Sequence, residues 1–118
     1  FMPFEEINRI DEEYFKTILE DDFVFEGAIK IPDSLIVKGK IKGKLESNSL
    51  VVIGPDSIID ADITSKQLQC YGKINGNLTI EDEVYFHSPS VINGDITTNL
   101  ITVEKGCKIN GKIRMLTE

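Results

Sequence analysis

A five-residue unit of the form apolar–x–small–x–apolar occurs six times in the chain and constrains its fold more than any other feature. The central small residue is glycine in five copies and alanine in one. The copies are Phe25–Ile29, Ile41–Leu45, Ile59–Ile63, Ile74–Leu78, Ile92–Ile96 and Ile109–Ile113. Successive central residues lie 16, 18, 15, 18 and 17 positions apart. A repeat at a nearly fixed step indicates an architecture that stacks one structural unit on the next.

The length of the step selects the kind of unit. About 17 residues are too few for a helix plus a strand, and too few for a propeller blade. They suffice for one coil of a β-solenoid, in which short strands joined by tight bends pair in parallel with the next coil about 4.8 Å away. The sequence therefore predicts an all-β fold, a parallel β-helix of about six coils.

The alternation inside each unit predicts which side chains enter the core. The two outer apolar residues point to one side of a strand, and the residues between them point to the other. We expect glycine in the middle where the chain bends or packs closely, because glycine reaches positive φ at no steric cost. The second and fourth positions are expected to face water and to be free to vary. Three of the second positions are asparagine, and they predict an outer ladder of Asn75, Asn93 and Asn110.

Residues 3–20 follow a helical period instead. Their apolar residues recur every three or four positions, and the acidic residues fall on the opposite side. We therefore divide the chain into residues 1–22, an amphipathic N-terminal helix, and residues 23–118, the β-helix. The residues expected to pack a capping helix onto the first coil are Phe4, Ile7, Ile10, Tyr14 and Ile18.

Charge is distributed unevenly between these two parts. The formal net charge is −7, and residues 1–22 hold eight acidic residues against Arg9 and Lys16. The remaining residues are nearly neutral, with 12 acidic and 11 basic side chains. No basic stripe suited to nucleic acid is present in the sequence, and no glycine-rich loop between a strand and a helix suggests a nucleotide site. We therefore expect that the chain binds no nucleic acid, no nucleotide and no cofactor.

The sequence offers little catalytic or metal-binding chemistry. His87 is the single histidine and is expected in a surface bend, so we predict no catalytic residue and no metal site. Cys70 and Cys107 form no metal or redox motif, and we expect both to be buried thiols. No apolar run is long enough to span a bilayer and no leader pattern is seen, which favours a cytoplasmic location.

One enzymatic alternative has a specific motif behind it. The stretch Ile53–Ile63 resembles the hexapeptide repeat of left-handed β-helix acyltransferases. The hexapeptide spacing is confined to one coil. The coil lengths also vary, whereas a hexapeptide coil needs six residues on every face. This alternative remains open at the level of the sequence.

One pattern is shared by the stretches Leu35–Leu45, Leu50–Gly54, Tyr71–Leu78 and Cys107–Ile113. Across most of the chain this pattern resembles that of the bactofilins, bacterial polymer-forming cytoskeletal proteins. The resemblance implies a right-handed β-helix, triangular in section, that joins end to end into filaments without nucleotide. It also implies work in the cytoplasm, often against the inner membrane, where the family positions cell-wall enzymes or shapes the cell. Cell-wall and inner-membrane proteins are therefore the expected partners besides the chain itself.

The ends of a solenoid are the expected contact surfaces, because a terminal coil leaves an open strand edge and an open apolar core. From chain order we predict self-association through Ile109, Ile113, Met115, Leu116, Phe23 and Phe25. Three positions for the N-terminal helix stay open: a cap on the first coil, a membrane surface, or a partner protein. A cap would block one end and restrict assembly to dimers. A solenoid that binds partners without polymerising is the third functional alternative.

Overall fold

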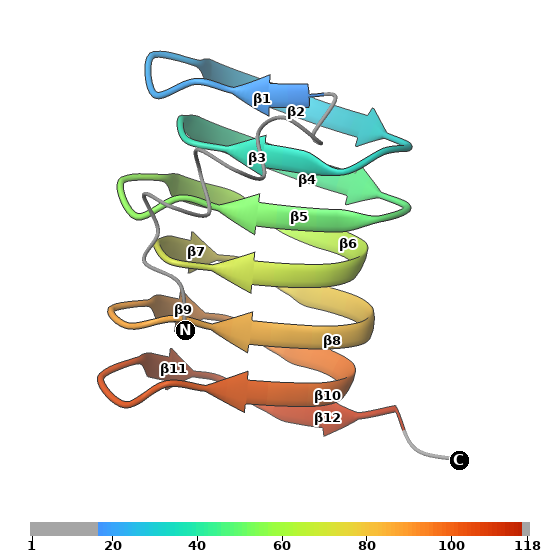
Figure 1. The fold of residues 1–118 in the computed structure, drawn as a ribbon, viewed down its shortest axis with the longest axis vertical. Helices are drawn as coiled ribbons and strands as arrows, with labels where there is room; N and C mark the ends of the chain where they lie inside the picture. Colours follow the sequence, from blue (N-terminus) through green and yellow to red (C-terminus); the bar gives the residue numbers. More distant parts are fainter. Residues whose placement is uncertain (1–16, 117–118) are drawn as a thin grey trace.

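The computed structural model describes residues 17–116, which fold as a parallel β-solenoid of six coils (Figure 1). All pairings between its strands are parallel, and the coils stack in chain order from β1 and β2 at one end to β11 and β12 at the other. The strands are β1 Thr17–Leu19, β2 Val24–Ile31, β3 Leu35–Val37, β4 Lys40–Ser47, β5 Leu50–Ile53, β6 Ile58–Cys70, β7 Lys73–Asn75, β8 Leu78–Phe86, β9 Val91–Asn93, β10 Ile96–Val103, β11 Lys108–Asn110 and β12 Ile113–Met115. The predicted all-β solenoid is confirmed.

Each coil contributes to three walls. The first wall consists of β1, β3, β5 and the C-terminal parts of β6, β8 and β10. The second and third walls lie on the two sides of the small residue in each repeat unit, as in β4 before and after Gly43. In-register pairing places equivalent residues of successive coils above one another, so Ile41 stacks on Ile59 and Leu45 on Ile63.

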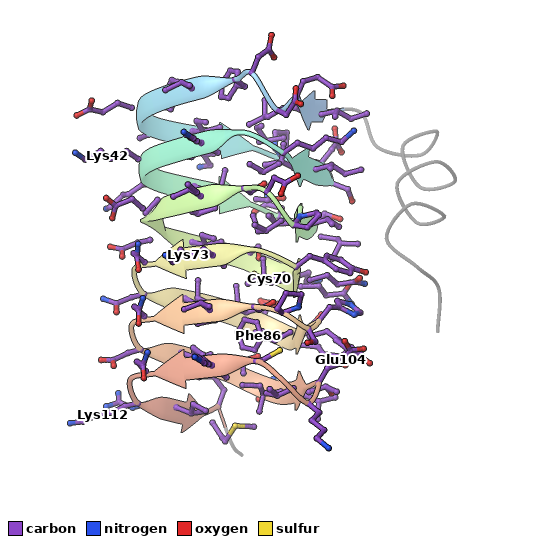
Figure 2. The ribbon with its side chains drawn as sticks, turned by 90° about the vertical axis from the view of Figure 1, so that its left-hand side faces the viewer. Lys42, Cys70, Lys73, Phe86, Glu104 and Lys112 are labelled. Atoms are coloured by element: carbon purple, nitrogen blue, oxygen red, sulfur yellow. The ribbon has the colours of Figure 1, made fainter. Side chains whose placement is uncertain are left out.

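The stacked apolar residues form one continuous core along the rod. Equivalent positions of the repeat units are fully buried in the inner coils, as at Ile59, Ile74 and Ile92. Figure 2 shows Cys70 and Phe86 lying inside the rod, while Lys42 and Lys112 point away from it. The predicted division between inward and outward positions is therefore confirmed.

The glycine column occupies the bend between the second and third walls. Gly43, Gly76, Gly94 and Gly111 all have φ between +127° and +152°. A Cβ atom on any of the four would overlap the backbone carbonyl of the residue one coil earlier, as Gly94 would with Gly76. Both predicted reasons for glycine, the bend and the close approach, hold at these positions.

The outer face of the bend is more constrained than expected. The asparagine ladder is present, with Asn93 Nδ2 donating to Asn75 Oδ1 at 2.8 Å and Asn110 Nδ2 to Asn93 Oδ1 at 2.9 Å. The fourth position of the unit is not free where it holds aspartate or asparagine, because that side chain accepts a backbone N–H from the next coil. Asp62 accepts from Asn77 N at 2.9 Å, and Asp95 accepts from Lys112 N at 3.0 Å.

The helix predicted over residues 3–20 is wrong at its C-terminal end. Thr17–Leu19 is strand β1 and pairs with Leu35–Val37 of β3. Ile18 therefore lies in the first coil and cannot belong to a capping helix. An apolar residue next to β-branched Thr17 fits either period, and a parallel partner strand decides between them. The other residues of the expected cap, Phe4, Ile7, Ile10 and Tyr14, lie outside the described residues.

Within residues 17–116, no helix is long and apolar enough to cross a membrane.

Candidate self-association surfaces

The inward columns of the rod change from buried to exposed at its ends. In the column of Leu45, Ile63, Leu78 and Ile96 every side chain is at most 1% exposed, whereas Ile113, which continues that column in the last coil, is 46% exposed. The same residue type at the same position of the repeat therefore meets solvent because no further coil follows within the described part of the chain. A further coil stacked on this end would cover Ile113 in the way that Ile113 covers Ile96.

The C-terminal end surface groups three of the predicted residues. Ile113 and Met115 belong to β12, and Leu116 follows directly, with its backbone N–H donating to Thr98 O at 2.7 Å. Met115 and Leu116 are each 39% exposed. The fourth predicted residue, Ile109, is partly buried against the core in β11. The structure thus brings all four to the last coil.

The N-terminal end surface is built around two aromatic rings. Phe23 and Phe25 stack with centroids 6.1 Å apart and an interplanar angle of 9°. Both are partly buried against the core cluster, together with Ile29 and Ile31 of the same coil. The two phenylalanines predicted from chain order therefore do form part of the first coil's apolar face.

The strand edges at the two ends also indicate contact surfaces. Among residues 17–116, β1 pairs with β3 alone and β2 with β4 alone, whereas each inner coil pairs on both sides. At the other end, β11 pairs with β9 and β12 with β10. Each end therefore presents backbone donors and acceptors of a terminal strand layer, which can template a further strand.

The two end coils carry opposite charge. Residues 17–34 have five acidic side chains against Lys30, a formal charge of −4. Residues 100–116 have four basic side chains against Glu104, a formal charge of +3. Coulomb attraction alone therefore favours contact between unlike ends, and salt screens this preference.

His87 is not the surface-loop residue that the sequence suggested. It is 6% exposed, and its ring is stacked on Tyr71 and Tyr85 with centroid distances of 4.1 and 4.2 Å. Burial lowers its pKa, and the Glu104 carboxylate, 3.5 Å from Nδ1, partly opposes this. The stack joins His87 to Tyr85 two residues earlier and to Tyr71 one coil earlier, and only the contact with Tyr71 has no counterpart in the local sequence.

The described residues also include two thiols and open surface hollows. Cys70 is buried, and burial raises the pKa of its thiol to about 12. Cys107 is partly buried. No group of three or more metal-ligating side chains occurs within residues 17–116. One hollow of about 470 Å³ is open to solvent and is lined mainly by short polar side chains, together with Lys66, Glu81 and Leu116.

Three comparisons place this geometry among known proteins. Residues 17–114 match the sequence profile of the bactofilins, described as polymer-forming cytoskeletal. The fold is similar to a bactofilin from Thermus thermophilus, reconstructed by cryo-EM as double helical filaments, with a TM-score of 0.79 at 17% identity over 82% of this chain and 96% of that one. It is also similar to the cytoskeletal bactofilin BacA, solved by solid-state NMR, with a TM-score of 0.74 at 20% identity over 86% and 96%. No curated protein sequence matches the chain.

Proposed function

The chain belongs to the bactofilin family of polymer-forming cytoskeletal proteins, and on that premise we propose that it is a non-enzymatic scaffold whose rods join end to end through their first and last coils. In this role it contributes to cell shape or to the organisation of the cell envelope. Its main partner is a further copy of itself.

One observation carries the proposal: the inward columns are buried in every inner coil and open at the terminal ones. Covering a half-exposed isoleucine, methionine or leucine contributes about 1 kcal/mol for each side chain. A stacked rod supplies that cover and a strand edge for the terminal backbone groups in one contact. The structures of the two similar bactofilins, one of them a filament, lend further support through the shared fold.

Finer features of the family belong to the same proposal. We propose right-handed winding, which is supported by the strong preference for right-handed connections between parallel strands. We also propose a cytoplasmic location, with attachment at the inner membrane through partner proteins. The absence of catalysis is supported by His87, whose ring faces are covered by tyrosines and cannot readily approach a substrate as a general base must.

The test is a pair of matched single substitutions. Ile113→Glu places a charge in the open core column at the C-terminal end, whereas Ile58→Glu places it on an outward position of the second wall. The two isoleucines are similarly exposed, at 46% and 42%. Sedimentation velocity and negative-stain microscopy should show filaments for the unsubstituted chain and Ile58→Glu, and short species for Ile113→Glu.

Two outcomes would count against end-to-end assembly. If both variants form filaments of normal length, the C-terminal end is not a contact surface. If the unsubstituted chain stays monomeric at every salt and protein concentration, polymerisation is not a property of this chain, and a partner-binding solenoid becomes the better description. Circular dichroism of each variant verifies that the β-solenoid is intact.

A further inference from the structure

The first wall has an outer face that is apolar. Leu35 and Val37 of β3 point into the core, so Ile36 between them points outward. Val52 occupies the equivalent position one coil later, in register with Ile36. These two outward side chains are nevertheless only 1% and 2% exposed. So little exposure at outward apolar positions distinguishes the first wall from an ordinary solvent-facing strand surface.

These residues form a cluster separate from the core. Ile36, Val52 and Tyr71 pack together, with Ile18 and Leu50 against them. We call this set of five residues the outer apolar face. The outward positions of the second wall are of another kind, since Lys42 and Asp60 there are charged and exposed.

The outer apolar face continues into aromatic rings in the later coils. Tyr71 stacks on His87, and His87 stacks on Tyr85. With these rings, the surface formed by the outer apolar face extends from Ile18 in the first coil to Tyr85 in the fifth. Four steps between coils of about 4.8 Å make this surface about 19 Å long.

We propose that the outer apolar face is the docking site of residues 4–16 of the same chain. The segment lies along the side of the rod as an amphipathic helix, with Phe4, Ile7, Ile10 and Tyr14 against the face. Its acidic side chains point to solvent.

Length and attachment both suit this occupant. Thirteen helical residues extend about 20 Å, close to the length of the face. The segment joins the rod at Thr17, and the next residue, Ile18, already belongs to the face. A helix that turns back from this point runs over Ile36 and Val52 toward the aromatic rings.

Tethering favours this segment over other occupants. A peptide joined directly to its binding surface has an effective concentration in the millimolar range. A second copy of the rod at micromolar concentration competes poorly with it. An anionic membrane is disfavoured as well, because the acidic side of the segment repels anionic headgroups.

Docking on the side has a different consequence from a cap on the first coil. The side position leaves Phe23 and Phe25 at one end and Ile113 at the other accessible. Residues 4–16 then stabilise the rod without limiting its growth. This placement replaces the end cap expected from the amphipathic pattern, and it does not depend on filament formation.

A single tryptophan tests the docking, because the chain has none. Tyr14→Trp in the full chain places the reporter on the apolar side of the segment. We expect blue-shifted emission and low acrylamide quenching. Adding Ile36→Gln and Val52→Gln should shift the emission to longer wavelength and raise quenching several-fold, whereas adding Ile58→Gln on the second wall should change neither.

A second variant protects the test against misfolding of the wall. Ile7→Gln with Ile10→Gln changes the segment alone, so the solenoid remains intact by circular dichroism while the reporter becomes exposed. An exposed reporter in the otherwise unsubstituted Tyr14→Trp chain would overturn the proposal. It would also be overturned by a blue shift that disappears on dilution, which indicates a second copy, or by one that requires anionic vesicles.

Discussion

At the scale of the residue, Gly94 shows how strictly the bend selects its side chain. Its φ of +148° lies where residues with a Cβ are strained, and a Cβ would overlap the carbonyl oxygen of Gly76. Ala61 occupies the equivalent place in the third coil without positive φ. Alanine is therefore tolerated where β6 runs through the bend, but not where the chain turns at a glycine.

Gly94→Ala should lower the free energy of unfolding by about 2 kcal/mol or more, because both backbone strain and a steric overlap oppose it. Thr79→Ala, at an exposed strand position, is the control and should lose less than about 1 kcal/mol. Chemical denaturation measures both. Equal losses would mean that the bend relaxes to accept a methyl group.

The Cys70 thiol should react slowly and make stability depend on pH. Its pKa is about 12 in the folded chain because it is buried, against about 8.5 when unfolded. Its contribution to stability is complete below about pH 8.5 and is lost as the pH rises toward 12. In a Cys107→Ser background, a thiol reagent at pH 8 should modify Cys70 only at the rate of unfolding. Modification as fast as in the denatured chain would contradict this.

The glycine column and the inward columns were predictable from the sequence, because a period of two sets the facing of residues within a coil and a nearly constant step aligns equivalent positions of successive coils. The burial of His87 was not, because Tyr71 becomes its neighbour only once the coils are stacked, whereas Tyr85 lies two residues before it in the same coil. The repeat step therefore places residues of the repeated unit, such as the asparagine ladder, better than residues that lie between the units.

At the scale of the element, the bends of the later coils depend on side chains for hydrogen bonds that strands normally supply. Strands β7 and β8, β9 and β10, and β11 and β12 are interrupted at Gly76, Gly94 and Gly111. At each interruption a backbone N–H donates to a side chain one coil earlier, as Asp95 N does to Asn77 Oδ1 at 3.1 Å. The fourth position of the unit thus bridges the broken ladder.

Asp95→Ala should therefore cost about 1 kcal/mol of unfolding free energy, since it removes the acceptor of Lys112 N. Asp95→Asn should recover most of that loss, because Asn77 fills the same role with an amide oxygen. Thermal and urea unfolding of the three proteins provides the measurement. If the asparagine variant is as unstable as the alanine variant, charge is the feature that matters and not the acceptor atom.

The strand β1 was the element that the sequence misassigned. Residues 3–20 continue a helical period, and nothing within Thr17–Leu19 interrupts it. The strand exists because β3 offers a parallel edge in register, in which each partner residue is located eighteen residues further along the chain. Helical periodicity therefore overestimated the length of the segment that precedes the solenoid.

At the scale of the whole molecule, each coil contacts its neighbours alone, so the end coils are held from one side within residues 17–116. Repeat proteins of this kind open from their ends at lower free energy than from their middle. When assembly covers an end, the free energy needed to open that end should rise to the value found in the middle of the rod.

Amide hydrogen exchange should therefore slow in residues 108–116 when filaments form, while β7 in the fourth coil changes little. The reason is that β11 and β12 gain a partner strand and β7 already has two. The Ile113→Glu variant serves as the unassembled reference. Unchanged exchange at the last coil of assembled chains would place the contact elsewhere on the rod.

The solenoid and its end surfaces could be predicted because chain order alone decides which coils are terminal. The outer apolar face could not be predicted, because Leu35-Ile36-Val37 is apolar throughout. Such a run does not show which of its side chains point into the core and which point outward. Only the three-dimensional wall separates Ile36, which points outward, from its neighbours in the core.

The direction of the strands has a mechanical consequence. Strands run across the rod, so the hydrogen bonds between coils run along it, and a pull on the two ends loads every layer in series. Layers inside a rod are also joined by continuous chain, whereas a junction between two rods is not. A stretched filament should therefore break between subunits while each rod stays folded. The broken ends keep their strand edges and apolar columns, so the same subunits can rejoin once the tension is released.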